Sequence, residues 1–237
     1  QKPWVAPGKT WHWLEMYDWE RTPDGELILY NGMPRSSAYP QYAGTYNPDW
    51  IWGWSNTISY KDFTLNFSFD GRVGGYMFDY MSARMWHSGV HIDSDNAWRY
   101  DEVVNGNHKG YIAEGVKIVS GSVKYDSDGK ILEDTRVFAP NDVAVSYESF
   151  CRSYGDSSSK SHFLKSKTFF KLRELSISYR LPKKYCTGAL KGAEAALVGQ
   201  NLLLWSKGFR FSDPDVDSEN INSPSNRLIG FNIKLNF

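Results

Sequence analysis

The sequence predicts an all-β protein whose strands belong to a large transmembrane antiparallel β-barrel with long extracellular loops. Five segments of about ten residues alternate apolar and polar side chains, and this is the length that a tilted strand needs to cross a bilayer. The connections between them alternate between short and long, as in outer-membrane barrels, where the short turns are periplasmic. Aromatic residues make up 16% of the chain. This content is compatible with the aromatic girdles that border the membrane on such barrels.

Charge and hydropathy exclude two other classes of protein. The chain has 237 residues, of which 27 are basic and 27 acidic. It therefore has no net field to attract nucleic acid, and it contains no nucleic-acid recognition motif. The longest stretch with few charges, Ala193–Trp205, is too short and too polar for a membrane-spanning helix. Cys151 and Cys186 lie in no motif and would form a disulfide only if the fold brought them together.

The first segment, residues 1–50, is predicted to be an extracellular loop. No signal peptide opens it, so an exported protein that begins at Gln1 is expected to lack an N-terminal portion. A turn at Thr22-Pro23-Asp24-Gly25 allows Glu26–Tyr30 to pair back on Asp18–Arg21 as a short hairpin. The rest of the segment contains several prolines and glycines and is predicted to be irregular.

The barrel portion is predicted to cover residues 51–237, beginning with a tight hairpin. Two strands, 51–60 and 63–70, are joined by only Lys61 and Asp62. Their second face is rich in small hydroxyl and amide side chains, which suit a water-filled lumen. Their apolar face, interrupted only by Asn56, consists of Trp52, Trp54, Ile58, Tyr60, Phe63, Leu65, Phe67 and Phe69.

Residues 74–167 form the first of two long extracellular loops. Short helices are predicted at 76–86 and 142–154, with a hairpin turn at Asp126-Ser127-Asp128-Gly129. An interval this long without period-two alternation is unusual inside a compact soluble domain and ordinary on the outer side of a barrel.

Three further strands follow, at about 174–181, 193–204 and 229–237. A short basic turn connects the first two, and the second extracellular loop, 205–226, precedes the last. Five strands cannot close a barrel, and bacterial single-chain barrels have an even number of strands. The sequence is therefore interpreted as the C-terminal part of a larger barrel. The positions expected to face lipid are Trp54, Ile58, Leu65, Phe67, Ile177, Phe231, Ile233 and Leu235.

A series of short motifs in this order resembles the C-terminal region of the SusC/RagA family of TonB-dependent outer-membrane transporters. The resemblance covers residues 44–237, and Asp62 departs from it, because glycine or asparagine is more usual there. The motifs are Asn47-Pro48-Asp49-Trp50, Ser55-Asn56-Thr57, Tyr60-Lys61-Asp62-Phe63, Gly71-Arg72, Gly74-Gly75, Phe169–Glu174, Ser178–Pro182, Gly199-Gln200-Asn201-Leu202, Trp205, Asp213-Pro214-Asp215, Pro224, Arg227, Gly230 and Phe237.

The resemblance implies a barrel of about twenty-two strands with an internal plug, located in the bacterial outer membrane. It also implies a SusD-like surface lipoprotein as partner, energy from the TonB system through an N-terminal part outside this sequence, and surrounding outer-membrane lipid. The imported material would be an oligosaccharide or, in some members, an oligopeptide. Phe237, an aromatic residue at the end of an alternating strand, is similar to the signal by which such barrels are recognised for membrane assembly.

Candidate substrate-binding residues lie in the long loop, away from the membrane. Trp86 and Trp98, the latter followed by Arg99 and Tyr100, either pack as loop core or contact substrate beneath the lipoprotein. Sugars have apolar C–H faces that stack on aromatic rings, so the excess of Trp and Tyr favours an oligosaccharide over a peptide.

No metal, cofactor or catalytic residue is predicted. His87 and His91 have a spacing that suits zinc on a helix, but no third ligand is evident. An acidic run in the second loop lacks the glycine and terminal glutamate of a calcium loop and is expected to be solvated, with a bound loop calcium as the alternative. It consists of Asp213, Asp215, Asp217 and Glu219. No arrangement specific to an enzyme is present. The alternative from another class is a secreted carbohydrate-binding β-sandwich, which predicts two apolar faces packed on each other.

Overall fold

The computed structural model describes residues 3–4, 7–9, 11–156, 161–216 and 226–237. These contain eighteen strands and three α-helices, which confirms the all-β class. The chain divides into two compact units. The first combines Gln1–Tyr46 with Tyr76–Lys165, and the second combines Asn47–Gly75 with the described residues from Ser166 onward. The sequence did not indicate this grouping, and the assignment of residues 1–50 and 74–167 as extracellular stays a prediction.

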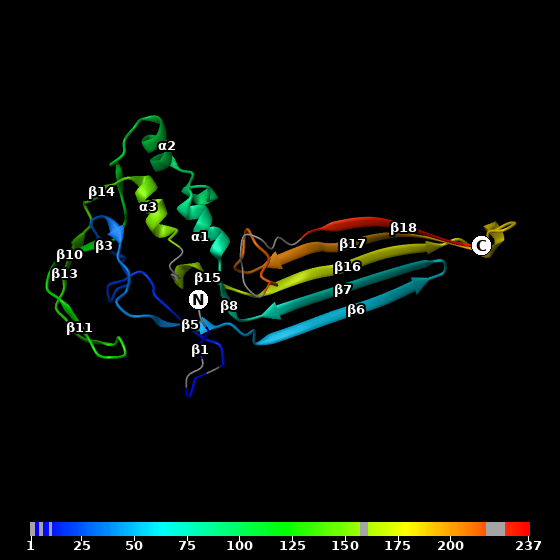
Figure 1. Cartoon of the computed structure of the whole chain (residues 1–237), viewed down its shortest axis with the longest axis horizontal. Helices are drawn as coiled ribbons and strands as arrows, with labels where there is room; N and C mark the ends of the chain where they lie inside the picture. The colour runs from blue at the N-terminus through cyan, green and yellow to red at the C-terminus, as the bar shows by residue number, and fades with distance from the viewer. Residues whose placement is uncertain (1–2, 5–6, 10, 157–160, 217–225) are drawn as a thin grey trace. The chain divides into compact units, whose positions relative to one another are not determined.

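The second unit is built on one antiparallel sheet of five strands in the order β18-β17-β16-β7-β6. The strands lie in the sheet in their order along the chain, and β7 pairs directly with β16 although residues 74–168 separate them in the sequence. All five predicted strands are confirmed. Figure 1 shows the β6–β7 turn, the β16–β17 connection and the C-terminus at the same end of the sheet. The strands are β6 (Trp50–Tyr60), β7 (Phe63–Val73), β16 (Phe169–Arg180), β17 (Gly192–Ser206) and β18 (Leu228–Asn236), and the 3₁₀ turn η3 (Lys183–Tyr185) lies between β16 and β17.

The strand register places the apolar positions of all five strands on one face. Trp54 lies opposite Phe69, and Leu65 lies between Ile58 and Ile177. Because successive side chains of a strand alternate between faces, these pairings and those of β17 with β18 align the apolar sets across the sheet. The eight positions predicted to face lipid therefore share one face. Six of them are about half exposed or more: Trp54, Ile58, Ile177, Phe231, Ile233 and Leu235.

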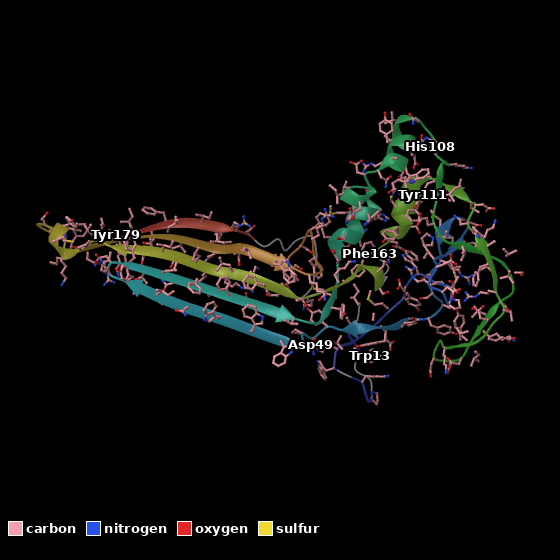
Figure 2. The ribbon with its side chains drawn as sticks, turned by 180° about the vertical axis from the view of Figure 1, so that it is seen from behind. Trp13, Asp49, His108, Tyr111, Phe163 and Tyr179 are labelled. Atoms are coloured by element: carbon pink, nitrogen blue, oxygen red, sulfur yellow. The ribbon has the colours of Figure 1, made fainter. Side chains whose placement is uncertain are left out.

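The other face of this sheet is polar and hydrogen-bonded across strands. Thr57 Oγ1 donates to Asn66 Oδ1 at 2.7 Å, and Asn66 Nδ2 donates to Ser176 Oγ at 3.1 Å. These three side chains come from β6, β7 and β16 and form a ladder of the kind that stabilises sheets. Asp49 and Tyr179 lie toward opposite ends of the sheet (Figure 2).

A β-bulge in β16 places one arginine over the polar face. The register of β16 with both neighbours shifts between Leu172 and Glu174, so Arg173 is the extra residue. Its Nε and Nη2 atoms each donate to Asp70 at 2.8 Å, which is a bidentate ion pair. Arg173 also donates to Asp215, in the segment after β17.

The acidic second loop is not solvated as the sequence suggested. Asp213 is buried and forms an ion pair with Lys171, whose side chain is also buried. Asp215 pairs with Arg173 and lies 3.3 Å from Arg72. A buried lysine requires a partner of opposite charge, and the loop provides it. Asp217 and Glu219 lie outside the described residues.

The first unit contains several small sheets, so the prediction of an irregular N-terminal segment is wrong in part. The turn at residues 22–25 is confirmed, with Gly25 N donating to Thr22 O at 2.9 Å. A three-stranded sheet has the order β1-β2-β5, and a four-stranded sheet has the order β13-β10-β3-β4. These strands are β1 (Pro3–Trp4), β2 (Trp13–Met16), β3 (Ile28–Tyr30), β4 (Met33–Pro34), β5 (Gln41–Thr45), β10 (Val116–Ser120) and β13 (Val137–Pro140).

Three two-stranded sheets complete the strand structure. The predicted turn at Asp126–Gly129 joins the first pair, β11 and β12, with Asp126 N donating to Lys130 O at 2.9 Å. The other pairs are β9 with β14 and β8 with β15. The strands are β8 (Tyr76–Phe78), β9 (Tyr111–Ile112), β11 (Val123–Tyr125), β12 (Ile131–Asp134), β14 (Ala144–Val145) and β15 (Leu164–Ser166).

Three α-helices lie together in the first unit: α1 (Tyr80–His87), α2 (Ala97–Val104) and α3 (Tyr147–Tyr154) (Figure 1). Helix α1 begins later than predicted because Tyr76–Phe78 pairs as β8, and α3 begins only after Ser146, its N-cap. Helix α2 was not predicted. Two 3₁₀ turns, η1 (Ile92–Ser94) and η2 (Ser161–Phe163), accompany them. None of the helices in the described part of the chain is long and apolar enough to cross a membrane.

The core of the first unit joins distant parts of the chain. Met16, Phe78, Ala83 and Phe163 are buried together. They come from β2, β8, α1 and η2 respectively. Trp86 of α1 and Tyr154 of α3 pack against this core, so it holds these two helices. Phe163 is labelled in Figure 2.

Candidate functional site

The three helices of the first unit line an open cavity of about 330 Å³. This is at the lower end of the range for small-molecule sites. Residues from all three helices line it, including His87, Arg99, Glu102, Tyr147, Cys151 and Arg152.

Side-chain caps fix where each helix begins. Asp79 accepts a hydrogen bond from Ser82 N at 3.0 Å at the start of α1, and Ser146 accepts from Ser149 N at 3.1 Å at the start of α3. Asn96 accepts from the second and third backbone N–H groups of α2. Capping residues of these types satisfy backbone donors that a helix leaves free, so the caps set the register of the cavity-lining residues.

Glu102 is the central charged group of the cavity. It is buried, and its carboxylate accepts from Ser146 Oγ at 2.7 Å and from Glu148 N at 2.9 Å. Burial acts to raise its pKa, but the hydrogen bonds from Ser146, Glu148 and His108 outweigh burial and lower the pKa below its ordinary value. The ionised carboxylate therefore joins α2 to the first turn of α3, where a negative charge is also favoured by the helix dipole.

The remaining lining groups are suited to binding. Asn96 Nδ2 donates to Tyr147 Oη at 2.6 Å, and burial raises the pKa of Tyr147, so its hydroxyl stays neutral. Burial also raises the pKa of the Cys151 thiol, which is therefore protonated at neutral pH and a poor nucleophile. Two guanidinium groups, from Arg99 and Arg152, add positive charge to the lining. The cavity can accommodate a small polar group by hydrogen bonds and charge.

The structure brings only one of the four predicted substrate residues to this cavity. Arg99 lines it, and its guanidinium donates to the carbonyl of Gly89. Trp86 stacks on His91 with ring centroids 5.0 Å apart and packs against the core of the unit, as loop core would. Trp98 and Tyr100 are on α2 and are 46% and 61% exposed, so both are available to a ligand at the surface. Their role in substrate binding stays a prediction.

The sequence did not point to Glu102, Tyr147 or His108. Tyr111, which packs edge-to-face on Tyr147 with ring centroids 5.0 Å apart, was also missed (Figure 2). The sequence did contain a signal for helix α2, which positions Glu102: Asn96 precedes an eight-residue stretch with an apolar side, a pattern that indicates a capped helix.

The two histidines considered for zinc are held by other groups. His87 Nδ1 lies 3.1 Å from the Arg152 carbonyl oxygen, and His91 Nδ1 accepts from Asp93 N at 3.2 Å. Within the described ranges, no group of three His, Cys, Asp or Glu side chains is placed to hold a metal ion. The two cysteines, Cys151 and Cys186, are both free.

Phe237, predicted as the assembly signal, directly follows β18 and is 72% exposed. The register of β18 continues the alternation to this residue, so its side chain belongs with the apolar face. Recognition during membrane assembly stays a prediction.

Comparison with known proteins identifies a similar fold. No family model matches the sequence, and no curated protein matches it. A structure of the RagAB peptide transporter has a TM-score of 0.54 at 16% identity, covering 94% of this chain and 23% of that chain. The RagAB peptide importer in the closed-closed state has a TM-score of 0.52 at 17% identity, with 93% and 22% covered. The RagAB peptide importer in the open-open state has a TM-score of 0.52 at 17% identity, covering 99% of this chain and 24% of that chain.

At this level of identity the similarity concerns the fold. The chain spans about a quarter of the length of the structures that it matches. Nearly the whole chain is included, so the match covers both compact units.

Proposed function

We propose that this chain is the C-terminal part of a SusC/RagA-type, TonB-dependent importer in the bacterial outer membrane. The observation that supports this most is the exposed apolar face of the five-stranded sheet. Contiguous apolar patches beyond a few hundred Å² are rare on soluble monomers and mark a membrane or a partner. A face of this kind opposite a hydrogen-bonded polar face is what a barrel wall between lipid and lumen requires. The proposal implies a barrel of about twenty-two strands.

A secreted carbohydrate-binding β-sandwich fits less well. A sandwich buries its two apolar faces against each other. Here Trp54, Phe231 and Ile233 are each more than half exposed. The role that we propose is therefore transport, without an enzymatic activity.

For the cargo we propose an oligopeptide as the first candidate and an oligosaccharide as the second. The solved structures of similar fold are described as a peptide transporter and a peptide importer, which favours the peptide. The aromatic content favoured an oligosaccharide. The exposed rings of Trp98 and Tyr100 keep that alternative open, because they could stack on sugar faces.

The partner that we propose is a SusD-like surface lipoprotein, bound through the segment 74–167. This segment contains all three helices and the cavity between them. Energy would come from the TonB system through a part of the protein outside this sequence.

The test is a deletion of the gene together with purification of the tagged protein from outer membranes. We expect loss of growth on oligopeptides as the nutrient source and co-purification of a lipoprotein. Loss of growth on a glycan alone would identify the cargo as an oligosaccharide. Normal growth on both, or recovery of the protein in the soluble fraction, would contradict the import proposal.

A further inference from the structure

A second cleft in the first unit, separate from the helical cavity, lies beside the four-stranded sheet and has a volume of about 530 Å³. Its walls come from β3 and the turn that follows it, from β10 and the segment after it, and from the residues that flank β13. Tyr30, at the end of β3, is 68% exposed at its edge. The function proposed above was inferred without this cleft.

One wall of the cleft is an open strand edge. Strand β10 pairs with β13 as far as Ser120, but its parallel pairing with β3 includes only Val116 and Lys117. Beyond Lys117, the described strands leave β10 with a neighbour on one side only. Ile118, the next residue, lines the cleft. An edge of this kind is a template for an extended peptide, which adds to a sheet through main-chain hydrogen bonds.

Two glycines give the cleft its shape. Gly32 has a φ of +76°, and a Cβ there would lie 2.6 Å from a methyl carbon of Val145. Gly121 has a φ of +83°, and a Cβ there would lie 2.0 Å from the carbonyl oxygen of Thr135. Both backbone conformations favour glycine, and neither position has room for a side chain. The cleft walls are thus defined by tight backbone packing.

The charged side chains that line the cleft are all basic: Arg35, Lys117 and Arg136. Arg136 is buried and held by Asp134, with Nε and Nη2 donating at 2.8 Å and 2.7 Å, and by Glu20. The carboxylates that pair with the three cations are not part of the lining.

Two of the cations remain accessible. Arg35 is 45% exposed and pairs with Glu20 through Nε, so its terminal nitrogens can bind another acceptor. Lys117 pairs with Asp142, whose side chain is 70% exposed, so this ion pair lies at the surface. Surface pairs of this kind are weak, so an incoming carboxylate can replace Asp142.

We propose that this cleft binds an extended peptide segment bearing a carboxylate, which pairs along the open edge of β10 and places its charge at Arg35 and Lys117. The carboxylate is an acidic side chain or the peptide's own C-terminus. The interpretation of this peptide as imported cargo rests on the proposed function. Binding itself requires no transport, so a failure of the binding test would leave the import proposal intact.

The experiment is fluorescence polarisation with the complete chain purified in detergent. The probe is a fluorescein-labelled hexapeptide of alternating Val and Glu with an amidated C-terminus. Three other peptides are compared with it. Two replace Glu with Gln, one with an amidated and one with a free C-terminus. The third keeps Glu and bears N-methyl groups on alternate residues. Trigalacturonate is the competitor that represents an acidic sugar.

The variants are Lys117→Gln and Arg35→Gln, with Lys124→Gln as the matched control. Lys124 forms the same type of exposed pair, with Glu133 at 2.6 Å, on β11 of the same unit, but it does not line the cleft. We expect the amidated Glu peptide, the free-acid Gln peptide or both to bind more tightly than the amidated Gln peptide, which bears no carboxylate. We expect Lys117→Gln and Arg35→Gln each to weaken binding about two- to fivefold. Lys124→Gln should have no effect, and N-methylation should abolish binding.

Several results would overturn the proposal. The first is that neither the amidated Glu peptide nor the free-acid Gln peptide binds more tightly than the amidated Gln peptide. The others are equal losses for Lys117→Gln and Lys124→Gln, or unchanged binding of the N-methylated peptide. Displacement by trigalacturonate with no measurable peptide affinity would assign the cleft to acidic sugars instead. Within a supported proposal, tight binding of the free-acid Gln peptide identifies the C-terminus as the recognised group, and tight binding of the amidated Glu peptide identifies the side chains.

Discussion

At the scale of single residues, Glu102 shows how one buried charge organises the helical cavity. Its carboxylate is hydrogen-bonded to residues 44 and 46 positions away in the sequence. Bonds to a charged acceptor are stronger than neutral ones, so the pair of contacts fixes α2 against α3.

We expect Glu102→Gln to destabilise the first unit by about 1–3 kcal/mol, because a neutral amide forms weaker bonds in the same place. The pKa of Glu102 is lowered on folding, so its contribution to stability is present above the unfolded pKa of about 4.3 and is lost as pH falls through the folded value. Denaturant titrations of both proteins between pH 3 and 7 measure this. The difference between them should shrink at the acidic end, and a constant difference would contradict the assigned role.

The two loop tryptophans are predicted to differ in effect. Trp86 packs on the core cluster and His91, so Trp86→Ala should lower the thermal midpoint clearly. Trp98 is half exposed, so Trp98→Ala should leave the midpoint nearly unchanged and weaken cargo uptake. Unfolding curves and uptake of labelled cargo separate the two roles. Normal uptake by Trp98→Ala would remove this residue from the substrate surface.

At the scale of elements, the two faces of the five-stranded sheet provide a matched pair of substitutions. Phe67 and Asn66 are neighbours on β7 that point to opposite faces. Phe67→Lys should destabilise the folded protein in lipid by about 2–4 kcal/mol if it lies near the bilayer midplane, whereas Asn66→Lys should cost far less. Folding titrations into lipid vesicles measure both. Equal losses would contradict the assignment of the apolar face to lipid.

Strand β18 provides a second test at this scale. Phe237 extends its apolar face by one position and pairs with no residue of β17 in the register, which ends at Asn236 opposite Gly192. Its deletion should therefore leave the sheet intact while lowering the amount of this protein in the outer membrane, as the proposed function requires. Quantitative blots of membrane fractions, with Asn236→Ala as control, measure this. Unchanged levels would leave Phe237 without an assembly role.

At the scale of the whole molecule, the sequence and the structure agree on the strands and differ on the segments between them. The strands β6, β7, β17 and β18 were predicted to within about three residues at each end, whereas β16 begins at Phe169, five residues before its predicted start. The first fifty residues and the interval 74–167 were predicted as separate loops. The structure packs their described parts into one unit with a common core.

The strands were predictable because their signal is local. In a sheet with one apolar and one polar face, apolar and polar residues alternate along each strand. This alternation can be read directly from the sequence. Even the polar ladder of Thr57, Asn66 and Ser176 follows from which residues share a face once the register is set.

The sites were decided by tertiary structure, because their energetic terms join residues that the sequence keeps far apart. Glu102 meets α3 across 44 residues, Lys171 meets Asp213 across 42, and Arg136 meets Glu20 across 116. In each case a buried charge requires a partner of opposite charge. The chain contains many carboxylates and cations, so composition alone does not identify which residue is the partner. The sequence by itself determined which residues form the five-stranded sheet and which side of it is apolar. Only folding selected the pairs that form the helical cavity, the charged cleft and the bound acidic loop, because pairing of buried charges depends on three-dimensional proximity rather than on spacing along the chain.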